Sequence, residues 1–175
     1  MGIFMKFFLG ALFSFIFGLV FGRILLKKQE SLPLDYWRNL SGKNRKLFDV
    51  TNEFFHIKQQ GYVLDNWFKK HSYKDIAIYG MANLGNRFAD ELLSGDVNIA
   101  YGIDKNTNIK DYKGIKIVSP NMKLENVDAV VVTVPTYFYE IRKDLQEKID
   151  CPIISLEEIL YQISDELVRE KSNGS

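Results

Sequence analysis

The chain has 175 residues and a mass of 20.3 kDa, with 26% charged and 46% hydrophobic residues, which leaves room for one ordinary domain and an appendage but excludes two large domains. A single cysteine, Cys151, excludes an internal disulfide framework, and two histidines argue against a multi-histidine metal site. Residues 1–74 carry 12 Lys/Arg and 5 Asp/Glu, whereas residues 75–175 carry 11 and 17. The acidic second part argues against a nucleic-acid partner, and the basic first part is typical of contact with anionic membrane lipid.

Residues 1–30 predict an N-terminal transmembrane anchor. The stretch from Ile3 to Leu26 is apolar apart from Lys6 and Arg23 near its ends, and as a helix it would extend about 36 Å, enough to cross a bilayer. A cleaved signal peptide is the alternative, but no small-x-small cleavage site follows the apolar run. The cations after the run predict a single-pass protein of the cell membrane with its C-terminal domain in the cytoplasm.

Four small residues recur at every fourth position inside this segment, which would place them on one helix face. Close approach of a second backbone there would allow a homo-oligomer or pairing with another membrane-anchored protein. The alternative is that these residues reflect only the ordinary composition of membrane helices. The residues are Gly10, Ser14, Gly18 and Gly22.

Residues 31–72 predict a connector that is aromatic, basic and helical. Leu47, Val50, Phe54 and Ile57 follow helical spacing, and Gly61 is a plausible stop, so we expect two or three short helices. These helices would pack as a collar on the next domain or lie at the membrane interface.

From residue 73 to about residue 170, short β-branched runs alternate with amphipathic stretches, and residues 171–175 are expected to be a disordered tail. The apolar strands require cover on both faces, which predicts an α/β fold with a doubly wound, mostly parallel, Rossmann-like sheet of about five strands. Ser155 to Glu158 has the pattern of a capping box that opens the last helix. The expected strands are 75–79, 97–103, 115–118, 129–134 and 153–154, and the expected helices are 84–93, 137–149 and 155–169.

A glycine-rich turn follows the first of these strands and opens a helix, which is the context of a nucleotide-binding fingerprint. The turn consists of Gly80, Met81, Ala82, Asn83, Leu84 and Gly85. Amides at the helix start would face a phosphate, and Asp104, with Lys105 beside it, ends the next strand where a carboxylate can accept from ribose hydroxyls. Ala82 stands where the middle glycine of the fingerprint usually lies. The alternative is a packing turn and an aspartate that only starts a turn.

The opposite wall of this site should follow the fourth expected strand, since ligands of such sheets lie at the carboxyl ends of strands. Its residues would be Thr133, Val134, Pro135, Thr136 and Tyr137, for which turn formation and helix capping are the equally plausible alternative. Tyr139 and Lys143 have the Tyr-x-x-x-Lys spacing of short-chain dehydrogenases, but they come too early in the chain for that fold. No metal is expected, and no set of residues identifies a catalytic centre.

The runs IAIYGMANLGNRFADEL, VNIAYGIDKN, VDAVVVTVP and IISLEEIL resemble a Rossmann-like domain of bacterial surface-polysaccharide proteins. The resemblance covers about residues 62–165 and extends to nucleoside-diphosphate-sugar epimerases and dehydratases and to the N-terminal domain of sugar acyltransferases. It implies binding of a nucleotide, a nucleotide-sugar or NAD(P) at the glycine turn and Asp104, in the service of capsule synthesis.

Three functional hypotheses remain open from the sequence. The first is a membrane-anchored nucleotide- or nucleotide-sugar-binding module that is accessory or regulatory in polysaccharide synthesis. The second is a ligand-free scaffold of a membrane glycan-synthesis complex. The third is a small nucleotide-sugar epimerase or reductase, for which the sequence offers no evident acid/base pair.

Overall fold

The computed structural model describes residues 33–106 and 108–173 and divides the chain into two compact units, residues 1–41 and 42–175. The predicted anchor and its stripe of small residues lie outside the described residues. Among the helices that the structure does describe, none combines the length and the apolar character needed to cross a bilayer. The anchor, its orientation and its pairing therefore stay predictions.

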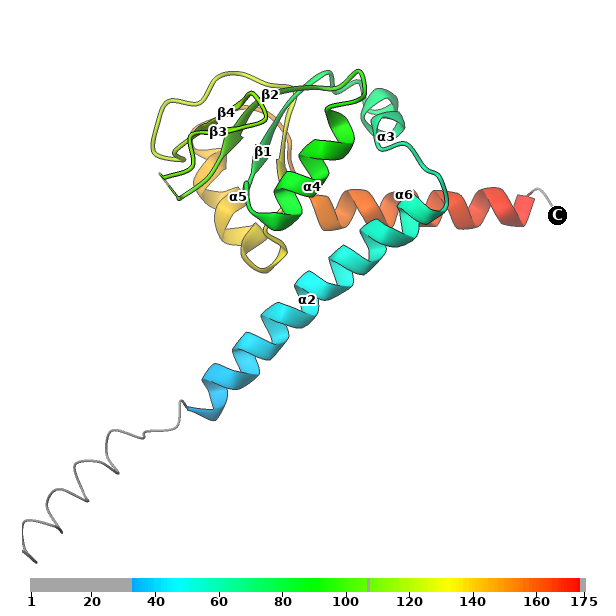
Figure 1. Ribbon diagram of the computed structural model, residues 1–175, viewed down its shortest axis with the longest axis horizontal. Coiled ribbons are helices and arrows are strands. Elements are labelled where there is room, and N and C mark those ends of the chain that lie inside the picture. Colours follow the sequence, from blue (N-terminus) through cyan, green and yellow to red (C-terminus); the bar gives the residue numbers. More distant parts are fainter. Residues whose placement is uncertain (1–32, 107, 174–175) are drawn as a thin grey trace, which may run out of the picture. The chain divides into compact units, whose positions relative to one another are not determined.

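The second unit is built around one six-stranded sheet with the order β3-β4-β2-β1-β5-β6 (Figure 1). All neighbouring strands are parallel except β3 and β4, which form an antiparallel pair. The α/β class and the mostly parallel sheet are thus confirmed. The strands are β1 Asp75–Tyr79, β2 Asn98–Ile103, β3 Asp111–Tyr112, β4 Ile115–Val118, β5 Ala129–Val132 and β6 Ile153–Ser155.

The expected count of about five strands missed β3, which has two residues and is too short to show an alternating pattern. Its turn to β4 places Lys113 and Gly114 at φ angles of +50° and +88°. The strand predicted at residues 129–134 is also too long, because β5 ends at Val132, where the chain leaves the sheet.

Helices cover both faces of the sheet, as the apolar strands require. Along β1, Ile76 and Ile78 face one hydrophobic cluster, and Ala77 and Tyr79 face the other. The first cluster takes buried side chains from α2, α3, α4 and α6, and the second takes them from α5, on the opposite face (Figure 1). The helices are α2 Leu34–Gln59, α3 Asp65–Lys70, α4 Asn83–Leu92, α5 Phe138–Gln146 and α6 Leu156–Asn173, with a 3₁₀ turn, η1, at Pro135–Tyr137.

The connector differs from the expected two or three short helices. One helix of 26 residues, α2, fills most of it, and a single short helix, α3, follows. No proline interrupts the sequence of α2, and Gly42 is tolerated within it, since a single glycine costs a helix only about 1 kcal/mol. Val50, Phe54 and Ile57 are buried as their spacing predicts, whereas Leu47 is 45% exposed. Gly61 follows the helix with φ +75°.

The C-terminal helix begins without the predicted capping box. Ser155 is the last residue of β6, opposite Val132, and its buried Oγ has no hydrogen-bond partner among the described residues. The Ser155 side chain is therefore buried and does not cap the first amides of α6. The helix then continues to Asn173, so the expected end at Arg169 and a tail starting at Lys171 are both too early.

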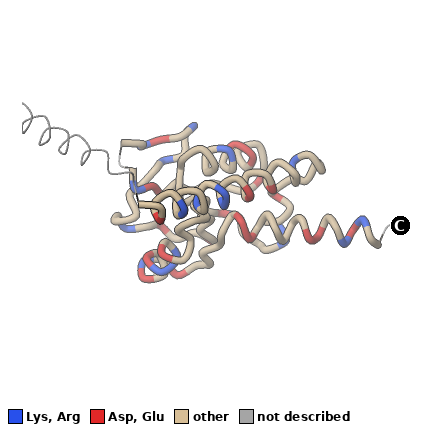
Figure 2. The backbone as a smooth tube through the Cα atoms, turned by 90° about the horizontal axis from the view of Figure 1, so that it is seen from below, with Lys and Arg blue, Asp and Glu red and all other residues tan. Residues whose placement is uncertain are grey.

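Ion pairs between helices reinforce the packing on the first face. Lys46 and Lys58 of α2 pair with Glu157 of α6 and Glu91 of α4, and Lys70 of α3 pairs with Glu166 of α6. Figure 2 shows acidic and basic positions interspersed along the helices of this unit. Each such pair is partly exposed and contributes about 1 kcal/mol at most.

Candidate functional site

The glycine turn after β1 is shaped by both backbone conformation and space. Gly80 has φ +98°, and its N–H donates to the carbonyl of Ile103 at 2.8 Å. A Cβ at this position would lie 2.4 Å from Cγ2 of Val134 and 2.9 Å from Oγ1 of Thr133. Only glycine satisfies both conditions, so the turn depends on Gly80.

Helix α4 starts directly on this turn. Ala82 is its N-cap with an extended backbone, and the amide of Asn86 donates to the Ala82 carbonyl at 2.8 Å. The amides of residues 83–85 precede that bond and have no acceptor within the helix. A Cβ on Gly85 would lie only 2.0 Å from the carbonyl oxygen of Gly80, so the close approach of helix and turn requires glycine here. Ala82 and Asn83 are exposed, which leaves this helix start open to an anion.

Two residues of the turn face away from a ligand at this helix start. Met81 is buried, and its Cγ occupies the space beside Gly102 of β2, where a Cβ would lie 2.7 Å away. Leu84 is partly buried and packs against the hydrophobic cluster of the first face. Their side chains therefore belong to the packing of α4 on the sheet.

In the chain segment after β5, some residues are buried in the protein and others are exposed at the candidate site. The hydroxyl of Thr133 is buried and donates to the carbonyls of Gly80 at 2.7 Å and Tyr79 at 3.1 Å. This hydroxyl therefore ties the end of β5 to the glycine turn. Pro135 is buried at the start of η1 and Thr136 is partly buried, whereas Tyr137 is 44% exposed.

A cavity of about 260 Å³ lies at the carboxyl ends of β1, β2 and β5. It brings together five of the predicted residues, which are Gly80, Asp104, Lys105, Val134 and Tyr137. The chain adds β2 on one side of β1 and β5 on the other, so the cavity lies at the point where the strand order reverses. We call this cavity the switch-point crevice. Its full lining is Tyr79, Gly80, Asp104, Lys105, Val134, Tyr137, Glu140, Ile141 and Asp144.

Sequence reasoning missed the wall that α5 contributes. Glu140 and Asp144 lie one helical turn apart on this helix and both line the crevice. The sequence signal that could have identified them is their spacing of four residues on a helix that follows a strand end, which places both on one face of that helix. A second cavity of about 410 Å³ shares Tyr79, Lys105 and Asp144 with the crevice and extends to Lys148 and the loop after β4.

The charges of the crevice are mostly negative. Three carboxylates and the ammonium of Lys105 line it. Oδ1 of Asp104 accepts from the amide of Asn106 at 2.7 Å, and within the described part of the chain no donor reaches Oδ2. Burial raises the pKa of Tyr79, and the carboxylates of Asp104 and Asp144 raise it further. The phenol of Tyr79 therefore stays protonated, and Oδ2 of Asp104 is open to a donor such as a ribose hydroxyl.

The remaining chemical groups of the described residues form no reactive cluster. Tyr139 is 77% exposed and does not line the crevice, so it lacks the setting of a dehydrogenase tyrosine. Residues 33–106 and 108–173 contain no group of three or more His, Cys, Asp or Glu side chains that could hold a metal. Burial raises the pKa of the Cys151 thiol, which disfavours its reactive thiolate form.

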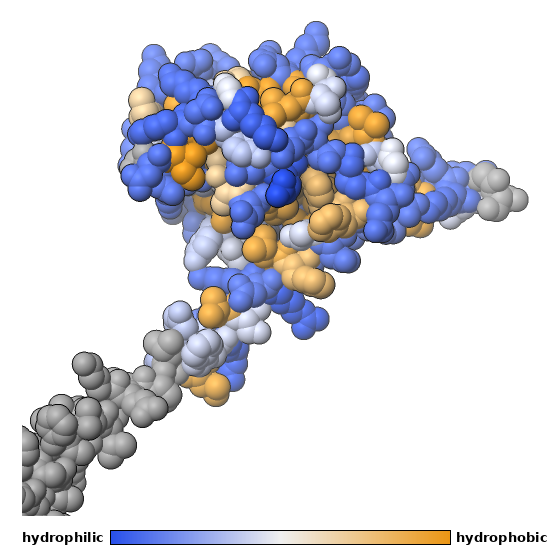
Figure 3. All heavy atoms as spheres, in the orientation of Figure 1, coloured by the Kyte–Doolittle hydropathy of each residue, from blue (hydrophilic) through white to orange (hydrophobic). Residues whose placement is uncertain are grey.

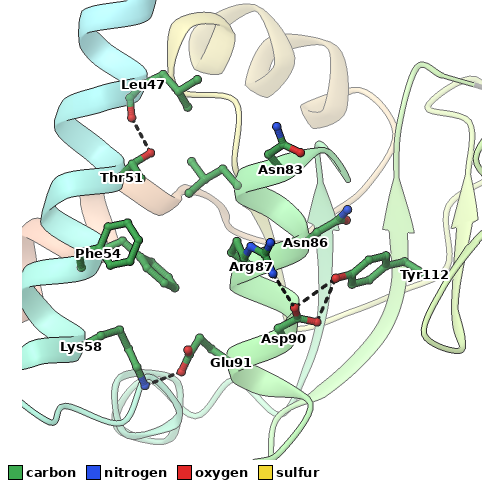
Figure 4. Close-up of a pocket in the computed structure, with 12 residues that line it drawn as sticks. Leu47, Thr51, Phe54, Lys58, Asn83, Asn86, Arg87, Asp90, Glu91 and Tyr112 are labelled. Atoms are coloured by element: carbon green, nitrogen blue, oxygen red, sulfur yellow. Dashed lines mark hydrogen bonds and ion pairs between the residues drawn. The ribbon is translucent and has the colours of Figure 1, made fainter.

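A larger groove of about 580 Å³ lies between α2 and α4 (Figure 4). Leu47, Thr51 and Phe54 of α2 face α4 across it, and the ion pair between Lys58 and Glu91 joins the two helices at one end. Asn86 also lines the groove, and its buried Oδ1 has no partner among the described residues. In Figure 3, which is drawn in the orientation of Figure 1, apolar side chains on this face form small patches bordered by hydrophilic ones.

Comparison with known proteins places this fold and site in a family. Searches of curated proteins and of solved structures found no match. A family model described as C2185-like, N-terminal, matches residues 72–166, which is more than half of the chain and includes all six strands, the glycine turn and the switch-point crevice. The chain therefore belongs to the C2185-like N-terminal family.

Proposed function

We propose that the chain is a Rossmann-like module that binds a nucleotide or nucleotide-sugar in the switch-point crevice. The observation that carries this proposal is the juxtaposition of Gly80 and Asp104 in one cavity at the point where the strand order reverses. Ligands of open α/β sheets lie at such points because the strand ends and helix starts on the two sides diverge there.

The groups around the crevice suggest how the ligand would be held. Oδ2 of Asp104 would accept from a ribose hydroxyl, while the open amides at the start of α4 would meet the phosphate. A volume of about 260 Å³ is below the usual range for whole cofactors, which begins at about 300 Å³, so the crevice suits the nucleoside part of a ligand. The adjoining cavity of about 410 Å³ would hold the part of the ligand that extends beyond the crevice. A nucleotide or nucleotide-sugar is favoured over NAD(P), because the methyl group of Ala82 stands at the turn.

Ligand binding can be tested with the full-length protein and a panel of NAD(H), NADP(H), nucleoside diphosphates and nucleoside-diphosphate sugars. Thermal shift identifies the best ligand, and isothermal titration measures its affinity. Asp104→Asn keeps the acceptor for the Asn106 amide but removes the charge and one acceptor oxygen, so we expect affinity to fall about ten-fold or more.

The matched control for this experiment is Asp111→Asn. Oδ1 of Asp111 similarly accepts a turn amide, that of Gly114 at 3.2 Å, but Asp111 lies outside the crevice. This control should bind like the parent. Unchanged affinity of the Asp104 variant, with its fold intact, would remove that carboxylate from the site.

We further propose that the module is anchored by residues 3–26 and serves bacterial surface-polysaccharide synthesis, as its resemblance implies. The protein should then stay with the membrane after a carbonate wash, and its C-terminal tail should resist protease added to intact cells. Release by carbonate would contradict the anchor, and cleavage of the tail would contradict the orientation.

A scaffold role is the second candidate. Phe48 and Phe55 of α2 are 69% and 61% exposed, and Phe55 lines the 580 Å³ groove. Such aromatic exposure is a feature of protein-interaction surfaces. If no compound of the panel shifts the melting temperature while Phe55→Ser abolishes association with a partner protein, the scaffold role replaces the nucleotide-binding role.

A further inference from the structure

Lys43 connects helix α2 to Tyr137, a residue that lines the switch-point crevice. Its Nζ contacts the hydroxyl of Tyr137 and lies 4.6 Å from the centre of that ring. The two residues are 94 positions apart in the sequence, and Tyr137 lines the crevice. Tertiary packing therefore places a cation of α2 beside a residue that lines the candidate ligand site.

The partner of Lys43 is unusual among the lysines of this helix. Lys46 and Lys58 are each paired with a carboxylate, of Glu157 and Glu91. Lys43 forms no ion pair with any carboxylate that the structure describes, and its hydrogen-bond acceptor is a neutral phenol. Exchanging a phenol for a phosphate would strengthen its interaction, because the ammonium group would then face a full negative charge in addition to a hydrogen-bond acceptor.

A phosphate at this site needs such a cation. The crevice itself carries three carboxylates against Lys105, and the first turn of α4, residues 83–86, has no charged side chain. Helix-start amides supply only a fraction of a positive charge. A nucleotide whose nucleoside part lies in the crevice would therefore bring its phosphate into a region that repels it unless an ammonium group comes close.

We propose that Lys43 is a phosphate-binding residue, whose ammonium turns from Tyr137 to the phosphate of a nucleotide held in the crevice. This inference rests on the proposed nucleotide-binding function and deepens it, because it names the side chain that would bind the phosphate. Because Lys43 belongs to α2 and Tyr137 to η1, the bound phosphate would also link the connector helix to the end of β5.

The test separates the phosphate from the nucleoside. Isothermal titration of the full-length protein uses two pairs of probes, uridine with UDP and adenosine with ADP. In Lys43→Met we expect the affinity for the preferred diphosphate to fall about ten-fold or more, while the affinity for the matching nucleoside stays unchanged. Lys46→Met, which removes a cation of the same helix that is paired with Glu157, should bind both probes like the parent.

Tyr137→Phe provides a second variant that keeps the aromatic wall. It removes only the hydroxyl that competes with the phosphate for Lys43, so diphosphate affinity should rise, and a fall in affinity would contradict the exchange of partners. Equal losses of nucleoside and diphosphate affinity in Lys43→Met would show that Lys43 acts on the shape of the crevice, and would overturn the phosphate role. Unchanged diphosphate binding in Lys43→Met would overturn it too, while leaving the nucleotide-binding function intact. Failure of the parent to bind any of the four probes or any compound of the wider panel would overturn both.

Discussion

Gly85→Ala is the substitution that most directly tests how α4 is seated on the glycine turn. The added Cβ would lie 2.0 Å from the carbonyl oxygen of Gly80 and 2.9 Å from Oγ1 of Thr133. Real Cβ atoms essentially never approach closer than 3.0 Å, so helix and turn must separate by about 1.0 Å. The obstructing atom belongs to the backbone and cannot rotate away.

The energetic balance favours a loss of stability. Alanine gains about 1 kcal/mol over glycine from helix propensity. Overpacking costs about 1–3 kcal/mol, and weakening the bond from the Thr133 hydroxyl to the Gly80 carbonyl adds about 1 kcal/mol. Separation would also loosen Phe88 and Leu92, whose side chains are fully buried beneath α4. We expect a net destabilisation of about 2 kcal/mol, which for a chain of this size lowers Tm by about 4–8 °C.

Thermal unfolding of the full-length protein, followed by circular dichroism, measures this effect against Gly42→Ala. Gly42 is also inside a helix, but a Cβ there would meet nothing within 4 Å, so the same substitution should stabilise the protein by up to about 1 kcal/mol. The two alanine variants should therefore shift Tm in opposite directions. A Gly85→Ala protein that melts at or above the parent temperature would refute the close packing of α4 on the turn.

Two further predictions concern pH. The amides of Asp75 and Lys74 donate to Oδ2 of Asp128 at 2.9 and 2.7 Å and hold the pKa of that carboxyl below its usual range. Its stabilising effect is therefore fully present above about pH 4 and is lost as pH falls through the lowered pKa. In urea titrations Asp128→Asn should be less stable than the parent at pH 6, and the difference should shrink as pH falls below about 4; a constant difference would contradict this. Burial raises the pKa of Tyr101 to about 12, and its hydroxyl donates to the carbonyl of Glu125 at 2.6 Å. Because the folded state holds the phenol proton of Tyr101 more tightly than the unfolded state does, the free energy of unfolding should fall as pH rises above about 10. In an ultraviolet titration the parent should show one tyrosine that ionises at higher pH than the others, and Tyr101→Phe should lack it.

Local patterns in the sequence were sufficient to predict most of the sheet. The strands at residues 75–79 and 115–118 were predicted with the bounds that the structure shows, because each is a short run rich in Ile with polar or glycine residues on both sides. Gly80 and Asp104 were predicted as partners for the same kind of reason. Each directly follows a strand, and the carboxyl ends of parallel strands meet at one edge.

Helix lengths in the connector could not be derived in this way. Aromatic residues such as Phe48 and Phe55 interrupt a clean amphipathic pattern, so the sequence indicated several short helices where one long helix exists. The burial that stabilises α2 comes from α4, α6 and the sheet, which lie far along the chain. Similarly, the two-residue strand β3 exists only because β4 pairs with it.

The sequence by itself determined the strand–helix alternation, the glycine turn and the acidic strand end, since each depends on neighbouring residues and on backbone chemistry. Only the tertiary structure decided what each side chain does. It assigned the Thr133 hydroxyl to the carbonyl of Gly80, brought Glu140 and Asp144 into the crevice wall, and set Lys43 against Tyr137. These contacts join residues separated by about 40 to nearly 100 positions, and local periodicity carries no information about which distant side chains packing will bring together.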